Sequence, residues 1–299
     1  AREIPLAVFF YNFSIMRTIQ SLFFFVALTL AACVPDDKSG PNPTETTVTI
    51  PTQGATSPTS YPNMSLFWAD EFTGSELSDN YWSHETGNGS NGWGNNELQF
   101  YRPQNTSIKD GHLIITAKKE AFGGKEYTSS RIITKSKKEF RYGRVDIRAA
   151  LPKGQGIWPA LWMLGSNFNT VSWPACGEID IMEMVGGSGR ENTVHGTVHW
   201  QNEGKHALFG GKTTLPSGTF SEKFAVYSVI WDATSIRWLV DNKQYHVIDT
   251  TPAELDEFRR NFFLIFNVAV GGNWPGSPNS STTFPQHLIV DYVRVFQAN

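Results

Sequence analysis

From residue 63 to residue 299 the sequence repeats short segments of alternating apolar and polar residues, each bounded by glycine, proline, asparagine or aspartate. This pattern is typical of β-strands that bury one face and end in tight turns. In the segment 143–149 (GRVDIRA), for example, charged side chains alternate with valine, isoleucine and alanine. Helical periodicity is nearly absent, and only 252–258 predicts a short surface helix, because a proline stands in its first turn. The sequence therefore predicts one all-β domain of two antiparallel sheets packed as a β-sandwich.

Further strands are expected wherever a short apolar or alternating run lies between turn residues. Asp241, Asn242 and Lys243 join two of these runs and predict a hairpin turn. The expected strands are 112–118, 157–164, 178–185, 194–200, 225–231, 236–240, 262–270 and 288–296.

The N-terminal region predicts export rather than a folded unit. Met16 and Arg17 precede the apolar run 21–30, which is too short for an ordinary membrane span and ends in small residues, as in a secretory signal. The run LAAC ending at Cys33 resembles the lipobox of bacterial lipoproteins, which implies acylation of Cys33 and attachment to a membrane face. Residues 1–33 are thus interpreted as an extension plus a lipoprotein signal peptide, with the extension before Met16. An ordinary cleaved signal without lipid is the alternative, so the protein is expected at the outer membrane or cell surface, or secreted.

Residues 34–62 are rich in proline, threonine, serine and glycine and predict a flexible linker, which leaves 63–299 as the folded domain that would carry any activity. The two cysteines, Cys33 and Cys176, lie in such different surroundings that a disulfide between them is not expected. A formal net charge of -3 indicates no nucleic-acid partner.

Three carboxylates on one otherwise apolar strand form the densest chemical signal, in the segment 173–187. Burying unpaired charge is costly, so a structural strand has no reason to carry Glu178, Asp180 and Glu183. Glu183 is an odd number of residues from the other two, and a β-bulge near Ile181 or Met182 would return it to their face.

With such a bulge the two glutamates are separated by roughly 13 Å between Cα atoms, at about 3.3 Å per residue. Long side chains that lean together are then compatible with the separation of about 5 to 5.5 Å that retaining glycosidases need between their carboxyl groups. One glutamate must be ionised to attack a sugar, and the other must be protonated to release the leaving group. The alternative is an acidic calcium site or a solvated face.

These segments together resemble glycoside hydrolase family 16, specifically its bulged, laminarinase-like branch of endo-β-1,3-glucanases. The resemblance runs from about Leu66 to Phe296. It is carried by EIDIME (178–183), WGNNELQ (93–99), WPALWML (158–164), HGTVHW (195–200), NVAVGGNWPG (267–276) and VDYVRV (290–295).

The resemblance implies a concanavalin A-like jelly roll with a concave substrate cleft and an enzyme that cuts internal β-1,3-glucan linkages with retention. Glu178 would be the nucleophile, Glu183 the acid/base and Asp180 their partner. Trp158 and Trp162 would stack on sugar rings, and His199 would lie near the acid/base, whereas His195 is expected to be structural. Further substrate contacts are expected from Arg131, Trp93, Asn95, Asn267, Trp274 and Gln286.

The family resemblance also implies a structural calcium ion on the convex face, held by the Asp291 side chain and main-chain oxygens around Glu71 and Gly111. Asp291 has the alternatives of capping a turn or pairing with Arg294. The chemistry itself requires no cofactor, and we expect a monomer that acts on a β-glucan polysaccharide.

Several functions stay open within this fold. The substrate alternatives are mixed-linkage β-1,3-1,4-glucan and a galactan such as agarose or carrageenan, and a sugar acceptor in place of water would make the enzyme a transglycosylase. A non-catalytic glucan-binding lectin on the same sandwich is the alternative from another class of protein.

Overall fold

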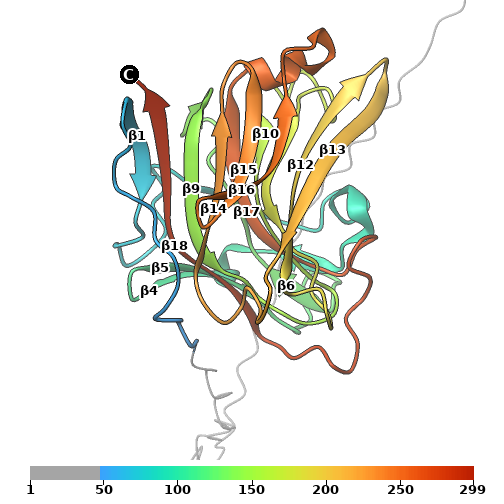
Figure 1. Ribbon diagram of the computed structural model, residues 1–299. Coiled ribbons are helices and arrows are strands. Elements are labelled where there is room, and N and C mark those ends of the chain that lie inside the picture. The colour runs from blue at the N-terminus through green and yellow to red at the C-terminus, as the bar shows by residue number, and fades with distance from the viewer. Residues whose placement is uncertain (1–47) are drawn as a thin grey trace, which may run out of the picture. The chain divides into compact units, whose positions relative to one another are not determined.

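The computed structural model describes residues 48–299, which form a sandwich of two eight-stranded antiparallel sheets (Figure 1). The predicted all-β jelly roll is confirmed. The first sheet contains, in spatial order, β16 (Lys243–Asp249), β15 (Ser235–Val240), β14 (Ala225–Trp231), β9 (Gly143–Ala150), β18 (Gln286–Ala298), β5 (His112–Ala117) and β4 (Thr106–Lys109), and β1 (Met64–Asp70) also pairs with β18. The second sheet contains β13 (Lys205–Thr214), β12 (Thr193–Asn202), β11 (Glu178–Glu183), β10 (Ile157–Gly165), β17 (Phe262–Val270), β7 (Arg131–Ile133) and β2 (Ser83–Glu85), and β8 (Glu139–Phe140) also pairs with β17.

Smaller elements connect the sheets. A short parallel pair joins β3 (Gln99–Tyr101) to β6 (Tyr127–Ser129), and the helical turns are η1 (Gly92–Asn96), η2 (Pro103–Asn105) and η3 (Ala253–Arg259). Within residues 48–299, no helix has the length and apolar character needed to cross a membrane.

The predicted turn and helix are present, with one difference. Asp241 and Asn242 have φ of 50° and 62°, which is the conformation of a two-residue hairpin turn between β15 and β16. The predicted surface helix is the 3-10 turn η3, and it is partly a core element, because Leu255 and Phe258 are buried.

The main core lies between the two sheets, because alternate residues of each strand point inward. In β10, Leu161 and Met163 face this core, whereas Trp158 and Trp162 lie on the outer face of the second sheet. Burial of large rings such as Trp82 stabilises the sandwich by roughly 2 to 3 kcal/mol per side chain. Part of the outer face of the second sheet carries a smaller buried cluster that includes Leu164, Phe263 and Ile265, with Trp162 packed against it. The same face carries the site described below.

The predicted flexible linker is wrong for its C-terminal part. Residues 53–61, which we name the N-terminal strap, pack on the first sheet: the Ala55 amide donates to the Phe224 carbonyl at 3.2 Å, and the Phe224 amide donates to the Gln53 carbonyl at 2.9 Å. Gly54 (φ 134°) permits this approach, since a Cβ there would lie 2.1 Å from the Phe224 oxygen. The folded body therefore begins before residue 63, and the expectations for residues 1–47, Cys33 included, concern residues outside the described range.

The strap also covers the charged face of β9. The Tyr61 hydroxyl donates to the Asp146 carboxylate at 2.7 Å, and the Arg148 guanidinium donates to the Ala55 carbonyl at 2.6 Å. All eight residues of β9 are consequently buried, although their sequence alternates between charged and apolar. Polar partners from the strap take the place of water on that face.

Candidate active site

A bulge in β11 brings the three carboxylates to one face of the second sheet. Asp180 pairs with Trp162 of β10, but the next paired residue on that side is Met182, so Ile181 is the extra residue of the strand. Ile181 and Met182 both face the core, and Glu183 returns to the outer face. The predicted bulge is confirmed at the predicted place.

The two glutamates have different hydrogen-bond donors. The Trp173 indole donates to Glu178 Oε2 at 3.0 Å, and the Trp158 indole donates to Glu183 Oε1 at 3.0 Å. Each carboxylate is therefore oriented by one rigid ring and keeps a second oxygen for chemistry. Trp173 lies in the loop before β11, whereas Trp158 lies on β10.

Asp180 is the most buried of the three, with 2% of its surface exposed. Its Oδ2 lies 3.2 Å from His199 Nε2, which is also 3.7 Å from Glu178 Oε1. His199 pairs with Glu178 across β11 and β12, so the expectation that His199 lies at the Glu183 end is wrong. The residue paired with Glu183 is His195. The pairing of β11 with β12 shifts register between Asp180 and Glu183. This shift decides that His199 pairs with Glu178 and His195 with Glu183.

Burial raises the pKa of each of the three carboxyls, from 4.5 to about 8 for Glu178 and Glu183 and from 3.8 to about 8 for Asp180. The charge of Asp180 raises the pKa of both glutamates further, whereas His199 lowers it. Arg131 lowers the pKa of Glu178 as well. Burial thus favours protonated carboxyls in the cluster, and Arg131 is the cation that favours the ionised form of Glu178 but is not among the groups acting on Glu183.

Aromatic rings border the carboxylates. Trp158 meets Trp274 edge to face at 5.6 Å, and Trp274 meets His195 at 5.0 Å. Trp274 is 43% exposed, so its ring offers a surface to a ligand. Trp162 lies four residues further along β10 on the same face as Trp158.

Trp162 is fixed by its neighbours on β17 and β7. Its indole donates to Asn267 Oδ1 at 2.8 Å, and the Arg131 guanidinium lies 4.9 Å from its ring centre and 4.6 Å from that of Trp93. Asn267 is buried and donates to the Tyr101 hydroxyl at 3.2 Å. Trp93, Trp162 and Arg131 therefore form one wall of the site, and their contact with substrate stays a prediction, whereas Asn267 positions Trp162.

Asn95 lies in η1, beside the same wall. Its side-chain amide donates to Glu97 Oε1 at 3.3 Å, and its main-chain carbonyl accepts from the Asn273 main-chain N–H at 2.9 Å. Glu97 is buried and accepts from Gln99 at 2.6 Å. This buried network ties η1 to the loop that carries Trp274, and Asn95 is one of its partly exposed members.

Two predicted site residues have other partners in the structure. Gln286 lies on the first sheet, where its amide accepts from the Lys153 main chain at 3.0 Å and donates to the Thr283 carbonyl at 2.9 Å, so it holds loops rather than substrate. Asp291 faces the Arg148 guanidinium at 2.7 Å and the His112 imidazole at 3.3 Å.

The Glu71 carboxylate is paired with the Arg294 guanidinium at 2.7 and 2.9 Å, and Gly111 is a turn glycine with φ of 73°. Asp291, with Arg148 beside it, lacks the surplus negative charge that a calcium ion requires. The Asp291 carboxylate, which is the one side chain expected to bind calcium, is thus already paired with Arg148, and the calcium site with its main-chain oxygens stays a prediction.

Two residues of the site were missed. Trp173 belongs to the carboxylate segment, but its contact with Glu178 depends on the path of the loop before β11. His206 of β13 approaches His199, with 2.9 Å between His206 Nε2 and His199 Nδ1, and its ring lies 4.6 Å from that of Trp173. Only the pairing of β12 with β13 reveals this contact, so the sequence offered no signal for it.

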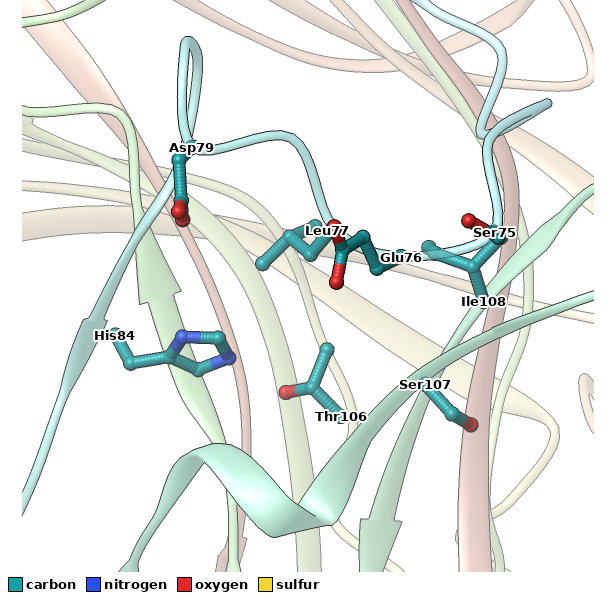
Figure 2. A pocket seen from close by; sticks show the side chains of 8 residues that line it. All are labelled: Ser75, Glu76, Leu77, Asp79, His84, Thr106, Ser107 and Ile108. Atoms are coloured by element: carbon teal, nitrogen blue, oxygen red, sulfur yellow. The ribbon is translucent and has the colours of Figure 1, made fainter.

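A cavity of about 370 Å³ lies elsewhere, between the edge strands β2 and β4 and the loop before them (Figure 2). Three strands of the second sheet separate β2 from β11. His84 and Asp79 border it, and no part of the carboxylate cluster does. We assign this cavity no part in the chemistry.

Comparison with known proteins agrees with this geometry. The sequence profile of Glycosyl hydrolases family 16 matches residues 94–294. The chain is 42% identical to a beta-glucanase of Rhodothermus marinus over 79% of this chain and 86% of that protein, and 41% identical to the clotting factor G alpha subunit of Tachypleus tridentatus over 79% of this chain. It spans only 34% of the clotting factor subunit.

Among solved structures, the laminarinase catalytic domain of Thermotoga maritima MSB8 aligns with a TM-score of 0.74 and 45% identity, over 79% of this chain and 99% of that domain. The profile match covers most of the body, including the bulged strand and its carboxylates. The chain belongs to glycosyl hydrolases family 16.

Proposed function

We propose that this glycoside hydrolase cuts internal β-1,3 linkages of a laminarin-type glucan with retention of configuration. The observation that carries the proposal is the bulge of β11, which places Glu178 and Glu183 on one face with different partners. A matched pair of acids that differ in environment is what a double displacement requires.

In the first step the Glu178 carboxylate attacks the anomeric carbon, and a covalent glycosyl ester forms as the glycosidic bond breaks. Glu183 gives its proton to the departing sugar oxygen, and its raised pKa keeps that proton available at neutral pH. His199 and Arg131 favour the ionised form of Glu178 that attacks.

In the second step Glu183, now ionised, takes a proton from water as the water oxygen attacks the same carbon. The ester bond breaks, Glu178 regains its charge, and Glu183 is again protonated. Asp180 lies between the two acids, and burial favours a proton on it as well. When Asp180 ionises, its charge raises the pKa of both glutamates and so favours the protonated Glu183 needed at the start.

The tryptophan rings beside the carboxylates support a glucan as the substrate, because flat rings stack on the apolar faces of pyranose units. Trp162 pairs with Asp180, the Trp158 indole donates to Glu183, and Trp274 meets Trp158 edge to face. The names of the relatives point the same way, since they include beta-glucanase and laminarinase.

A substrate panel of laminarin, lichenan, agarose and carrageenan tests the proposal, with sizing of the products. We expect short oligosaccharides from laminarin and no cleavage of agarose or carrageenan. Glu178→Ala and Glu183→Ala should abolish hydrolysis while glucan binding persists. Unchanged turnover in either variant would overturn the assigned roles, and longer products than the starting chains would identify a transglycosylase.

We also propose that the full chain is exported, acylated at Cys33 and active as a monomer on a membrane surface. The support is the apolar run 21–30 followed by LAAC at residues 30–33. Labelling of the full chain with a radioactive fatty acid should mark the wild type but not Cys33→Ala. Equal labelling of both would refute acylation at this residue, and size-exclusion chromatography of the body measures its oligomeric state.

A further inference from the structure

The distances around His199 suit one bound cation. Its Nε2 atom lies 3.2 Å from Asp180 Oδ2 and 3.7 Å from Glu178 Oε1, and the three ligand atoms lie within 4.8 Å of one another. Zinc binds nitrogen and oxygen ligands at about 2.0 to 2.2 Å, so two ligands at a tetrahedral angle are about 3.4 Å apart. The two distances from His199 lie on either side of that value, so the imidazole is already at ligand spacing from each carboxylate. The carboxylate oxygens of Glu178 and Asp180 lie within 4.8 Å of each other.

Asp180 gives an independent reason to expect a ligand. Its side chain is almost fully buried, and Oδ2 has no hydrogen-bond partner among the described residues, since His199 Nε2 is near it without hydrogen-bond alignment. A buried polar atom without a partner is costly, and a cation would satisfy it.

The surroundings also prepare His199 as a ligand. His199 Nδ1 lies 2.9 Å from His206 Nε2, and a hydrogen on Nδ1 that donates to His206 leaves the Nε2 lone pair directed at the carboxylates. Metal-binding histidines commonly donate their second ring nitrogen in this way. Trp173 occupies only Oε2 of Glu178, so Oε1 stays free.

We propose that Glu178, Asp180 and His199 bind a transition-metal dication of the zinc class and that the bound ion blocks glucan hydrolysis. A ligand set of one imidazole and two carboxylates favours such an ion over calcium, which prefers oxygen ligands alone. Metal binding itself needs only the three side chains. Inhibition rests on the proposed function, because the ion would occupy the oxygen with which Glu178 attacks.

Cobalt and zinc are suitable probes for the chain without an affinity tag and freed of metal. We expect one Co²⁺ ion to bind per chain, with a visible absorption band typical of Co²⁺ with few ligands. Zn²⁺ should displace the Co²⁺ ion and abolish the band. Asp180→Asn and His199→Gln each remove a ligand and should weaken Co²⁺ binding at least about 100-fold, whereas His206→Ala should weaken it about 10- to 100-fold.

His112→Gln is the matched control, because His112 faces the Asp291 carboxylate at 3.3 Å but belongs to no group of three possible ligands within residues 48–299. It should bind Co²⁺ as the wild type does. Thermal unfolding of every variant establishes that the protein is folded. Because Asp180→Asn and His199→Gln are measured separately, the test stands even if one of them does not fold.

Zinc should inhibit laminarin hydrolysis competitively, and a chelator should restore the rate. Equal Co²⁺ affinity in the wild type and Asp180→Asn, or no stoichiometric binding by a chain that does hydrolyse laminarin, would overturn the inference. Stoichiometric Co²⁺ binding by a chain that hydrolyses no glucan would instead leave the metal site standing and refute the proposed function.

Discussion

The buried Asp180 carboxyl should lower the free energy of unfolding of the protein as the pH rises, and Asp180→Asn should remove that contribution. Burial raises the pKa of Asp180 from its usual 3.8 to about 8 in the folded protein. Between these values the folded state holds a proton that the unfolded state has released, so stability is full below about pH 4 and falls as pH rises towards the folded pKa. Each pH unit costs about 1.4 kcal/mol, which amounts to about 3 kcal/mol between pH 5 and pH 7.

Asparagine cannot ionise, so the variant should lose less stability over that interval, and its advantage over the wild type should grow by about 3 kcal/mol from pH 5 to pH 7. Urea unfolding followed by tryptophan fluorescence at both pH values measures the difference. Asp256→Asn is the control, because its carboxylate is exposed and pairs with Arg260 on the surface, and its difference from the wild type should be nearly constant. A constant difference for Asp180→Asn as well would refute the argument that burial raises its pKa.

Two further substitutions test single contacts. Trp158→Phe removes the indole donor that lowers the pKa of Glu183, so the alkaline limb of kcat/KM should move up by about one pH unit; an unmoved or lower limb in the pH profile would contradict the assigned acid. Tyr61→Phe leaves buried Asp146 with one donor fewer and should reduce the free energy of unfolding by about 1.5 to 3 kcal/mol, while kcat stays the same; unchanged stability would show that the strap contributes little.

The sequence predicted the sandwich and its bulged strand because both follow from local patterns. Alternation identifies a strand with one buried face. Glu178, Asp180 and Glu183 on an apolar strand share a face only if one extra residue stands between Asp180 and Glu183, which predicts a bulge near Ile181 or Met182, and the structure places it at Ile181. The positions of the three acids therefore follow from burial energetics alone.

What the sequence did not predict depends on contacts between distant segments. The strap has few apolar residues, so its composition suggests a flexible linker, and it is held instead by Asp146 and Arg148 of β9. Gln286 and His199 were misplaced for a related reason. A glutamine such as Gln286 can bind a substrate in a cleft or hold a loop, and its sequence does not distinguish the two. The residue that His199 faces is decided by the register of β11 and β12, which a single extra residue changes.

The direct test of the central claim is rescue of the two glutamate variants with azide on an activated β-glucoside. If Glu178 is the nucleophile, Glu178→Ala should form the α-glycosyl azide, because azide attacks in its place with a single inversion. Glu183→Ala should form the β-glycosyl azide, because azide then attacks the intermediate on Glu178. The same anomer from both variants, or the reverse assignment of anomers, would contradict the account.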